Sequence, residues 1–482
     1  MNNILDLGIT SPSVIPELDS NFRPAMLAHQ SFLKSASSLE EITDVKIVLT
    51  RPDESAYSFK TSILAPKAKS SSLNFFFLER FIKCLLWSRG AAKIYCTAPR
   101  SLCDALNRHY ASNATGQWDA EMMGHRIFEE DFEIIHCSEA DLPQEKSHTA
   151  NLGRHMEGCR IGFDLGGSDR KIAALIDGKT VFSEEIVWDP IPQTDPQWHY
   201  DHIMDTLKLA ASKLPRVDAI GGSAAGVYVN NRVKVASLFR GVSESQFNSR
   251  VKDLFLELKR DWGDIPFEVV NDGEVTALAG SMNLNRNAVL GIAMGTNQAG
   301  GFVTPTGQIT PWLNELAFVP VDYHPEAPKD EWSGDRGCGV QYFSQQAVAR
   351  LIPSSGIKVP QGMPFPEQLL IVQKRMAEND PKAAAIYRTM GVYLGYALAQ
   401  YSQFYEFEHL LMLGRVMTGT GADLMIQKAK EVIQKDFSDL AEKIQFHTPD
   451  EKSKRHGQAM AAASLPDTAS HRSYLSLERT AT

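Results

Sequence analysis

The sequence predicts an α/β protein made of several domains, and three observations support this prediction. Segments with the alternating pattern of strands are interleaved with segments of helical periodicity along most of the chain. With 482 residues, the chain is too long for one ordinary hydrophobic core, so two or three domains are expected. Two groups of strand-like segments are joined by short glycine-containing turns, as in antiparallel meanders.

Residues 1–141 are predicted to form a small α/β module. Two strand-like segments flank the polar turn RPDESA, and an amphipathic helix closed by Gly90 follows them. The predicted strands are 44–50, 57–64, 91–98 and 132–137, and the predicted helices are 71–90 and 101–111. The residues of this module do not reveal a function. Packing or oligomerisation is one interpretation, and a lid over a neighbouring site is the other.

Residues 142–158 are polar and aperiodic, which predicts a linker, and residues 159–290 are predicted to form a first lobe. This lobe opens with a three-stranded meander that has the hairpin dipeptide Asp177-Gly178 at its second turn. The meander strands are predicted at 161–166, 171–177 and 180–188, later strands at 217–226 and 266–272, and helices at 202–214, 246–262 and from about Glu274.

A second lobe is predicted over residues 291–465. Another meander occupies 288–309, with Thr306-Gly307 at a turn, and the part that follows is mostly helical. A strand at 409–414 leads into the glycine-containing loop 415–423 and a helix. An alanine-rich helix at 454–465 precedes a polar tail, residues 466–482.

Composition excludes several classes of protein. The net charge of −9 argues against a protein that coats nucleic acid, because such binding needs a basic face. The six cysteines form no CxxC pair, as expected for reduced thiols in the cytoplasm. The N-terminus lacks the pattern of a signal peptide, and no apolar run approaches the roughly 20 residues of a membrane helix. We therefore expect a cytoplasmic protein with no membrane or nucleic-acid partner.

Glycine-rich turns and strand-end acids are the candidate functional features. IGFDLGGSDRK ends a buried strand on Asp164 and opens into a turn with a hydroxyl, Ser168. GTNQAGG forms a second turn with Thr296. Backbone N–H groups in a tight glycine turn form a concavity for anionic oxygens, and two such turns facing each other could grip a triphosphate. Asp164 is a candidate ligand of a hydrated Mg²⁺, and Asp272, at the end of VVND, is a candidate proton acceptor.

In order and spacing, these motifs resemble the ROK family of sugar kinases and regulators, within the hexokinase–actin–Hsp70 superfamily. The resemblance covers about residues 159–465 and rests on DLGGS, SAAGVYVNNRVKVASLFRG, VVNDGEVTALAG, GIAMGTNQAGGFV and HLLMLGRVMTGTGADL. It implies a two-lobed ribonuclease H-like ATPase fold of the actin–hexokinase type. It also implies ATP and Mg²⁺ as cofactors and a small sugar as substrate. We further expect a homo-oligomer, namely a dimer.

The resemblance assigns roles to individual residues. Asp272 would be the catalytic base, with Asn271, Glu315 and Gly226 on the sugar side and Asp164 at the metal. The nucleotide would contact three segments, through Gly166, Gly167, Ser168 and Lys171 in the first, Gly295, Thr296 and Asn297 in the second, and Gly414, Gly419 and Gly421 in the third.

The chain also departs from the family pattern. Asp169 should weaken phosphate binding unless Arg170 or Lys171 offsets its charge. The family's metal-binding histidine is Phe318, and two of its three zinc cysteines are Glu331 and Ser333. One soft ligand, Cys338, cannot make a structural zinc site, so we expect no zinc and a buried, small Cys338.

Two alternatives to a sugar kinase remain open. A non-catalytic sensor of sugar or nucleotide is one, because the phosphate turns are altered and family regulators keep the fold. Those regulators usually carry a basic winged helix, whereas the first module here has sheet-like segments and an acidic end, IFEEDFEIIHCSEADLP. A nucleotide-dependent assembly protein is the other alternative.

Overall fold

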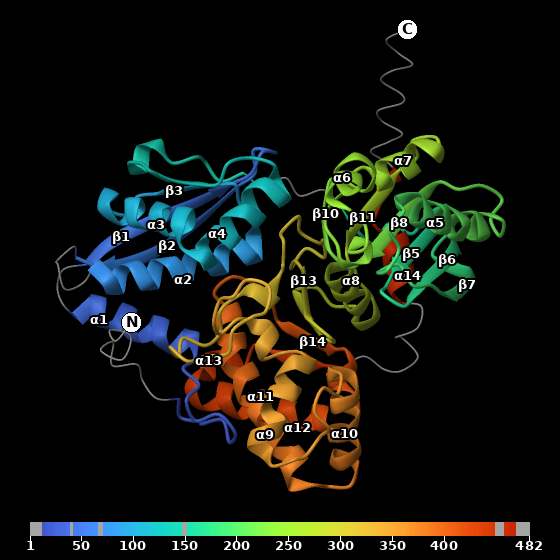
Figure 1. Ribbon diagram of the computed structural model, residues 1–482. Helices are drawn as coiled ribbons and strands as arrows, with labels where there is room; N and C mark the ends of the chain where they lie inside the picture. Colours follow the sequence, from blue (N-terminus) through green and yellow to red (C-terminus); the bar gives the residue numbers. More distant parts are fainter. Residues whose placement is uncertain (1–11, 39–41, 66–70, 147–151, 449–456, 469–482) are drawn as a thin grey trace.

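The computed structural model describes residues 12–38, 42–65, 71–146, 152–448 and 457–468. An N-terminal module, an N-lobe and a C-lobe follow one another along the chain and are visible as separate groups of elements (Figure 1). Residues 147–151 of the predicted linker and 469–482 of the predicted tail lie outside the described residues. Among the helices described, none is both long and apolar enough to cross a bilayer.

The N-terminal module contains a four-stranded sheet in the order β2-β1-β3-β4. β1 is antiparallel to β2 and β3, and β3 is parallel to β4. The strands are β1 (Ile42–Thr50), β2 (Ala56–Leu64), β3 (Lys93–Cys96) and β4 (Glu133–His136); the helices are α1 (Ala25–Ser38), α2 (Ser71–Arg89), α3 (Arg100–Ser112) and α4 (Ala114–Glu121), which continues as a π-helix over Met122–Phe128. The predicted strands and helices are confirmed, and α1 and α4 were not predicted.

The N-lobe is built on a five-stranded sheet in the order β11-β8-β5-β6-β7. β11, β8 and β5 run parallel, and β5, β6 and β7 form the predicted antiparallel meander. The strands are β5 (Cys159–Leu165), β6 (Asp169–Ile176), β7 (Lys179–Val187), β8 (Ala219–Ala224) and β11 (Phe267–Asn271). The register places Asp164 beside Ser223, and Ala224 beside Asn271. The polar ends of the three parallel strands therefore meet at one edge of the sheet.

The remaining elements of the N-lobe flank this sheet. They are α5 (Pro196–Ala211), the hairpin of β9 (Val227–Val229) and β10 (Arg232–Val235), α6 (Glu244–Gln246), α7 (Leu254–Asp261) and α8 (Asp272–Leu284). The single helix predicted over 246–262 is wrong, because a π-turn over Phe247–Val251 interrupts it. The backbone N–H of Val233 donates to the carbonyl of Lys252 (3.0 Å), so a bond to the hairpin takes the place of regular helix continuation.

The C-lobe combines a small sheet with a helical bundle. Its sheet has the order β13-β12-β14-β15, in which only β12 and β13 are antiparallel. The strands are β12 (Val289–Met294), β13 (Gln298–Val303), β14 (His409–Leu413) and β15 (Gln445–His447); the helices are α9 (Gln345–Ser355), α10 (Phe365–Ala377), α11 (Pro381–Tyr401), α12 (Thr420–Asp436) and α13 (Ser438–Ala441).

The last described helix, α14 (Gly457–Ala463), packs on the N-lobe, beside β5, β8 and α8 (Figure 1). A Cβ on Gly162 would lie 1.8 Å from the carbonyl oxygen of Ala459, and one on Gly221 would lie 1.7 Å from that of Ala462. Only glycine allows this close approach of helix and sheet. The predicted boundary placed 454–465 in the C-lobe, whereas the contacts assign α14 to the N-lobe.

The N-terminal module is docked on the C-lobe. One continuous hydrophobic cluster includes side chains of both, such as Leu85 of α2 and Tyr342. Beside it, the fully buried ammonium of Lys83 contacts Asp119 (2.8 Å) and Asp335 of the C-lobe (2.8 Å). Arg80 also donates to Asp335 (2.9 Å). Buried charges need such partners, so this cluster fixes α2 against the loop that contains Asp335.

Candidate active site

Asp164 lies near the end of β5 and is buried. Its Oδ1 accepts a hydrogen bond from the Ser223 hydroxyl (2.7 Å), and its Oδ2 lies 3.4 Å from the Lys171 ammonium. Burial raises the pKa of Asp164, and Lys171 and Ser223 only partly oppose that rise. The carboxyl therefore occupies a position where a further cation would be favourable.

The first glycine turn, residues 166–168, leaves Gly167 and Ser168 exposed. The turn is closed by the Gly166 N–H, which donates to the Asp169 carbonyl (2.9 Å), and the Trp188 indole donates to the Gly166 carbonyl (2.8 Å). A Cβ on Gly167 would have Ile191 Cδ1 as its nearest atom, at 3.7 Å. The turn is thus anchored at its base and open on its outer side.

Asp169 and the two bases after it have different partners. The Lys171 ammonium lies 3.0 Å from Asp169 Oδ1. Burial lowers the pKa of Lys171, but Asp164 and Asp169 raise it by more, so the net shift of this pKa is upward. Arg170, the next residue along the strand, is buried and donates to the carbonyl of His202. Side chains alternate between the faces of a strand. Lys171 therefore offsets the charge of Asp169, and Arg170 does not.

Asn271 and Asp272 begin helix α8. The side-chain Oδ1 of Asn271 caps the helix by accepting from the Gly273 N–H (2.7 Å), and its side-chain Nδ2 donates to the Gly226 carbonyl (2.7 Å). Burial, followed by the nearby charge of Asp164, raises the pKa of Asp272 to about 6. Asp272 is therefore ionised at neutral pH, although proton binding is easier than for an ordinary aspartate.

Two further carboxyls lie next to Asp272. Burial and the charge of Asp272 raise the pKa of Glu315 to about 8. Burial also raises the pKa of Glu274 to about 8; the Asn314 amide, which donates to Glu274 (3.1 Å), opposes that rise. Both groups are largely protonated at neutral pH and can donate hydrogen bonds. The backbone N–H of Glu315 donates to the carbonyl of Trp87 (2.9 Å), so the N-terminal module holds this segment.

The second turn, residues 295–297, connects β12 and β13, with Thr296 and Asn297 exposed. The Gly295 N–H donates to the Asn297 carbonyl (2.9 Å), and the Gly295 carbonyl accepts from the N–H of Gln345, the first residue of α9 (2.9 Å). The amide of Gln346 donates to the Asn297 side chain (3.2 Å). The N-terminus of α9, which carries partial positive charge, therefore lies directly behind this turn.

The third glycine segment connects β14 and α12. Gly414 has φ +98°, and a Cβ there would lie 2.5 Å from the Met294 carbonyl oxygen, next to the second turn. Gly419 is exposed and has φ +80°, and among the described residues no atom would lie within 4 Å of a Cβ added there. Gly421 is buried against the ring of Tyr387, at 2.4 Å from its would-be Cβ. Helix packing alone accounts for glycine at 421.

The structure brings some of the predicted residues together. The charge of Asp164 contributes to the raised pKa of Asp272, and the charge of Asp272 contributes to the raised pKa of Glu315. One hydrogen bond links Asn271 to Gly226. Sequence reasoning missed Ser223, Glu274 and Asn314. Ser223 lies one strand over from Asp164 in register, and Glu274 follows Asp272 by two residues at the start of a helix, so both positions could have been inferred from the predicted strand order.

The segment aligned with the family's zinc element is organised by side chains of the N-terminal module. Phe318, at the position of the family's histidine, packs on Trp87 (4.4 Å between ring centroids) and Trp118 (5.0 Å). Asp335 belongs to the buried ion cluster with Lys83. Cys338 is fully buried, as predicted. Aromatic packing and ion pairs therefore fix this loop.

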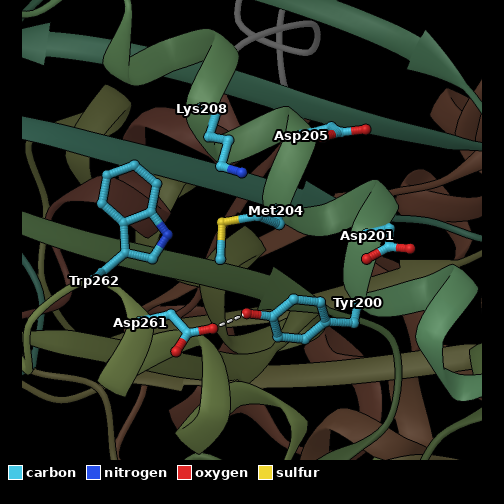
Figure 2. Close-up of a pocket in the computed structure, with 7 residues that line it drawn as sticks. All are labelled: Tyr200, Asp201, Met204, Asp205, Lys208, Asp261 and Trp262. Carbon is cyan, nitrogen blue, oxygen red and sulfur yellow. Dashed lines mark hydrogen bonds between the residues drawn. The ribbon is translucent and has the colours of Figure 1, made fainter.

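Two cavities are candidates for ligand sites. Figure 2 shows the first, an open hollow of about 660 Å³ between α5 and α7, where the Tyr200 hydroxyl donates to Asp261. None of the predicted site residues lines it. The second, of about 520 Å³, is lined by Gly226, Asn271 and Glu274 together with side chains of the N-terminal module. The second cavity therefore adjoins the predicted site.

Comparisons with solved structures show which proteins share this fold. A ROK hexokinase from Thermus thermophilus matches with a TM-score of 0.50 and 16% identity, over 67% of this chain and 99% of the hexokinase. A ROK-family transcriptional regulator, a homologue of the E. coli MLC protein, matches with a TM-score of 0.50 and 18% identity, over 65% of this chain and 79% of the regulator. No family model and no curated protein matches the chain.

Proposed function

We propose that this protein phosphorylates a sugar hydroxyl with ATP. It has the two-lobed α/β fold of the ROK hexokinase and the ROK regulator, as the sequence resemblance predicted. The observation that carries this proposal is a set of three buried acids: Asp272, with a pKa of about 6, Glu315, with a pKa of about 8, and Asp164, which lies beside Lys171. Groups whose surroundings separate their pKa values are typical of acid–base sites.

In this mechanism Asp272 is the general base. It is ionised at neutral pH, and its pKa of about 6 makes it a better proton acceptor than an ordinary aspartate. A sugar hydroxyl held against its carboxylate would lose its proton to Asp272 as the oxygen attacks the γ-phosphorus of ATP and ADP leaves. Glu315, protonated at neutral pH, would orient the ring by donating a hydrogen bond.

The two exposed turns are proposed to hold the nucleotide. The N–H groups around Gly167 and Ser168 and the hydroxyl of Thr296 are available to phosphate oxygens, and Lys171 supplies a positive charge beside the first turn. The residues fit Mg²⁺, because Asp164 offers one buried carboxylate and this ion usually binds one or two carboxylates plus phosphates. Mg²⁺ bound there would neutralise negative charge on the phosphates.

A non-catalytic sensor is the second candidate, and two observations favour it. Both polar ends of the Asn271 side chain are already bonded within the protein, which leaves less capacity for a sugar. Phe318 stands where the family pattern has its metal-binding histidine, and it packs into an aromatic cluster with Trp87 and Trp118. A sensor would bind sugar or nucleotide without transfer.

The test is sugar-dependent formation of ADP by the purified full-length chain, with Mg²⁺–ATP and a panel of hexoses and amino sugars. The kinase proposal expects at least one sugar to give both ADP and a sugar phosphate in equal amounts. A folded protein that binds a sugar and nucleotide but forms no sugar phosphate would instead be a sensor.

A further inference from the structure

The second cavity is formed by all three parts of the molecule. Arg51 and Phe128 come from the N-terminal module, the hairpin residue Val229 from the N-lobe, and Thr310 from the C-lobe. Its volume of about 520 Å³ falls within the range of about 300–1,000 Å³ typical of small-molecule sites. The N-terminal module therefore closes one side of the cavity.

The wall contributed by the module is rigid. The Arg51 guanidinium donates to the carbonyls of Gly90 (3.2 Å), Arg89 and Pro311 (2.6 Å), which joins the module to the C-lobe segment that lines the cavity. The same guanidinium lies over the Phe128 ring, 5.3 Å from its centroid. A wall fixed in this way is preorganised, which lowers the entropic cost of binding a ligand.

The cavity leads to the proposed catalytic residues through Glu274. This carboxyl is 5% exposed, lines the cavity, and accepts a hydrogen bond from Asn314. Asn271 also lines the cavity; it directly precedes Asp272 in the chain and caps the helix that Asp272 begins. A ligand at Asp272 that extended past Asn271 and Glu274 would therefore enter the cavity.

The lining favours a neutral, hydroxyl-rich group. The Arg51 charge is accompanied by the carboxyls of Asp53 and Glu268, while Glu274 is largely protonated at neutral pH, so the lining offers a phosphate or carboxylate no net positive charge. The Glu274 carboxyl has bonding capacity left, and the Thr310 hydroxyl, on a residue only 3% exposed, has no hydrogen-bond partner among the described residues. Buried polar groups of this kind are normally satisfied, and ligand hydroxyls could satisfy them.

We propose that the acceptor sugar carries a neutral, hydroxyl-rich substituent, such as a second sugar ring, which occupies the cavity between the N-terminal module and the two lobes. The proposal rests on the proposed function in that it takes the molecule at Asp272 to be a sugar. It assigns the module a role in substrate selection: the module builds the far wall of the acceptor site.

The experiment compares monosaccharides with their disaccharides in equilibrium binding. Glucose, galactose and N-acetylglucosamine are titrated calorimetrically into the full-length chain, alongside maltose, cellobiose, lactose and N,N′-diacetylchitobiose. The proposal expects at least one disaccharide to bind tenfold or more tightly than its monosaccharide. If no disaccharide binds more tightly than the corresponding monosaccharide, the proposal is wrong.

A cavity-filling variant locates the effect. Val229→Trp places a large side chain at the half-buried lining of the cavity, whereas Val181→Trp makes the same change at an exposed position of β7. The tenfold preference should disappear in Val229→Trp, with monosaccharide affinity unchanged, and persist in Val181→Trp. Equal preference in both variants would overturn the proposal, and melting temperatures establish that both are folded.

Phosphate transfer measured on the same samples separates this inference from the proposed function. Transfer to the disaccharide supports both. Disaccharide preference that is abolished by Val229→Trp, without transfer from ATP, would refute the kinase proposal and retain the cavity as a sugar site. Transfer to a monosaccharide without any disaccharide preference would support the kinase and refute the role of the cavity.

Discussion

The raised pKa of Glu274 can be tested through protein stability, because ionisation of this carboxyl changes the free energy of unfolding. Its pKa is raised to about 8 in the folded protein, against an ordinary value of 4.5, and burial is the main cause. The folded state therefore keeps a proton that the unfolded chain releases. This contribution to stability is fully present below pH 4.5 and is lost as the pH rises through 8.

We expect Glu274→Gln to flatten the dependence of stability on pH. The neutral amide keeps an oxygen for Asn314 and cannot ionise. Between about pH 5.5 and 7.5, the free energy of unfolding of the wild type should fall by up to about 1.4 kcal/mol per pH unit more than that of the variant. Urea unfolding at several pH values measures this difference. Glu184→Gln, on the exposed face of β7, is the control, and equal slopes in all three proteins would contradict the assigned pKa.

At the scale of elements, helix α2 connects the module to the loop that carries Asp335. Lys83 is 0% exposed and bonds two carboxylates, Asp119 and Asp335. Removing one partner of a buried ion pair leaves an uncompensated charge, which typically costs about 3–5 kcal/mol. Exposed ion pairs contribute far less, about 0–1 kcal/mol.

Lys83→Met should therefore lower the free energy of unfolding by about 3 kcal/mol or more. Lys146→Met is the matched control, because Lys146 pairs with Glu54 at the surface, where the two side chains are 48% and 79% exposed. The control should change stability by less than about 1 kcal/mol. Denaturant unfolding compares the two variants with the wild type, and similar small losses in both would show that the buried cluster does not hold the module in place.

Elements that a local sequence pattern determines could be predicted from the sequence. Elements that depend on distant contacts could not. The meander of β5, β6 and β7 was predictable because alternation and Asp177-Gly178, both at positive φ, are local signals. The break at Phe247–Val251 was not, because it depends on a bond between Val233 and Lys252. Helical periodicity says nothing about a partner strand elsewhere in the chain.

At the scale of the whole molecule, the order of the parts along the chain differs from their grouping in space. The last helix, α14, returns to the N-lobe and packs through Gly162 and Gly221. The first described residues pack on the C-lobe, where Asp19 accepts from Tyr393 (2.6 Å) and pairs with Arg350 (3.2 Å). Neither arrangement is encoded in a local pattern, so a sequence alone could suggest the lobes but not which terminal segments complete them.

The candidate site was predictable to a similar extent. The motifs identified Asp164, Asp272 and Glu315. In the structure, the charge of Asp164 helps to raise the pKa of Asp272, and the charge of Asp272 helps to raise that of Glu315. They could not indicate that Lys171 rather than Arg170 pairs with Asp169, because this depends on which face of β6 each side chain occupies. They also gave no sign that the module contributes Arg51 and Phe128 to a neighbouring cavity.

The most direct test of the proposed mechanism is to compare phosphate transfer by the wild type and by Asp272→Asn, with sugar and nucleotide affinity measured on the same proteins. A general base contributes about 10²–10⁴-fold to such a reaction. Loss of transfer by that factor, with affinities within a few-fold of wild type, is the result we predict. Undiminished sugar-dependent transfer by Asp272→Asn would contradict the proposed role of this carboxylate and the mechanism built on it.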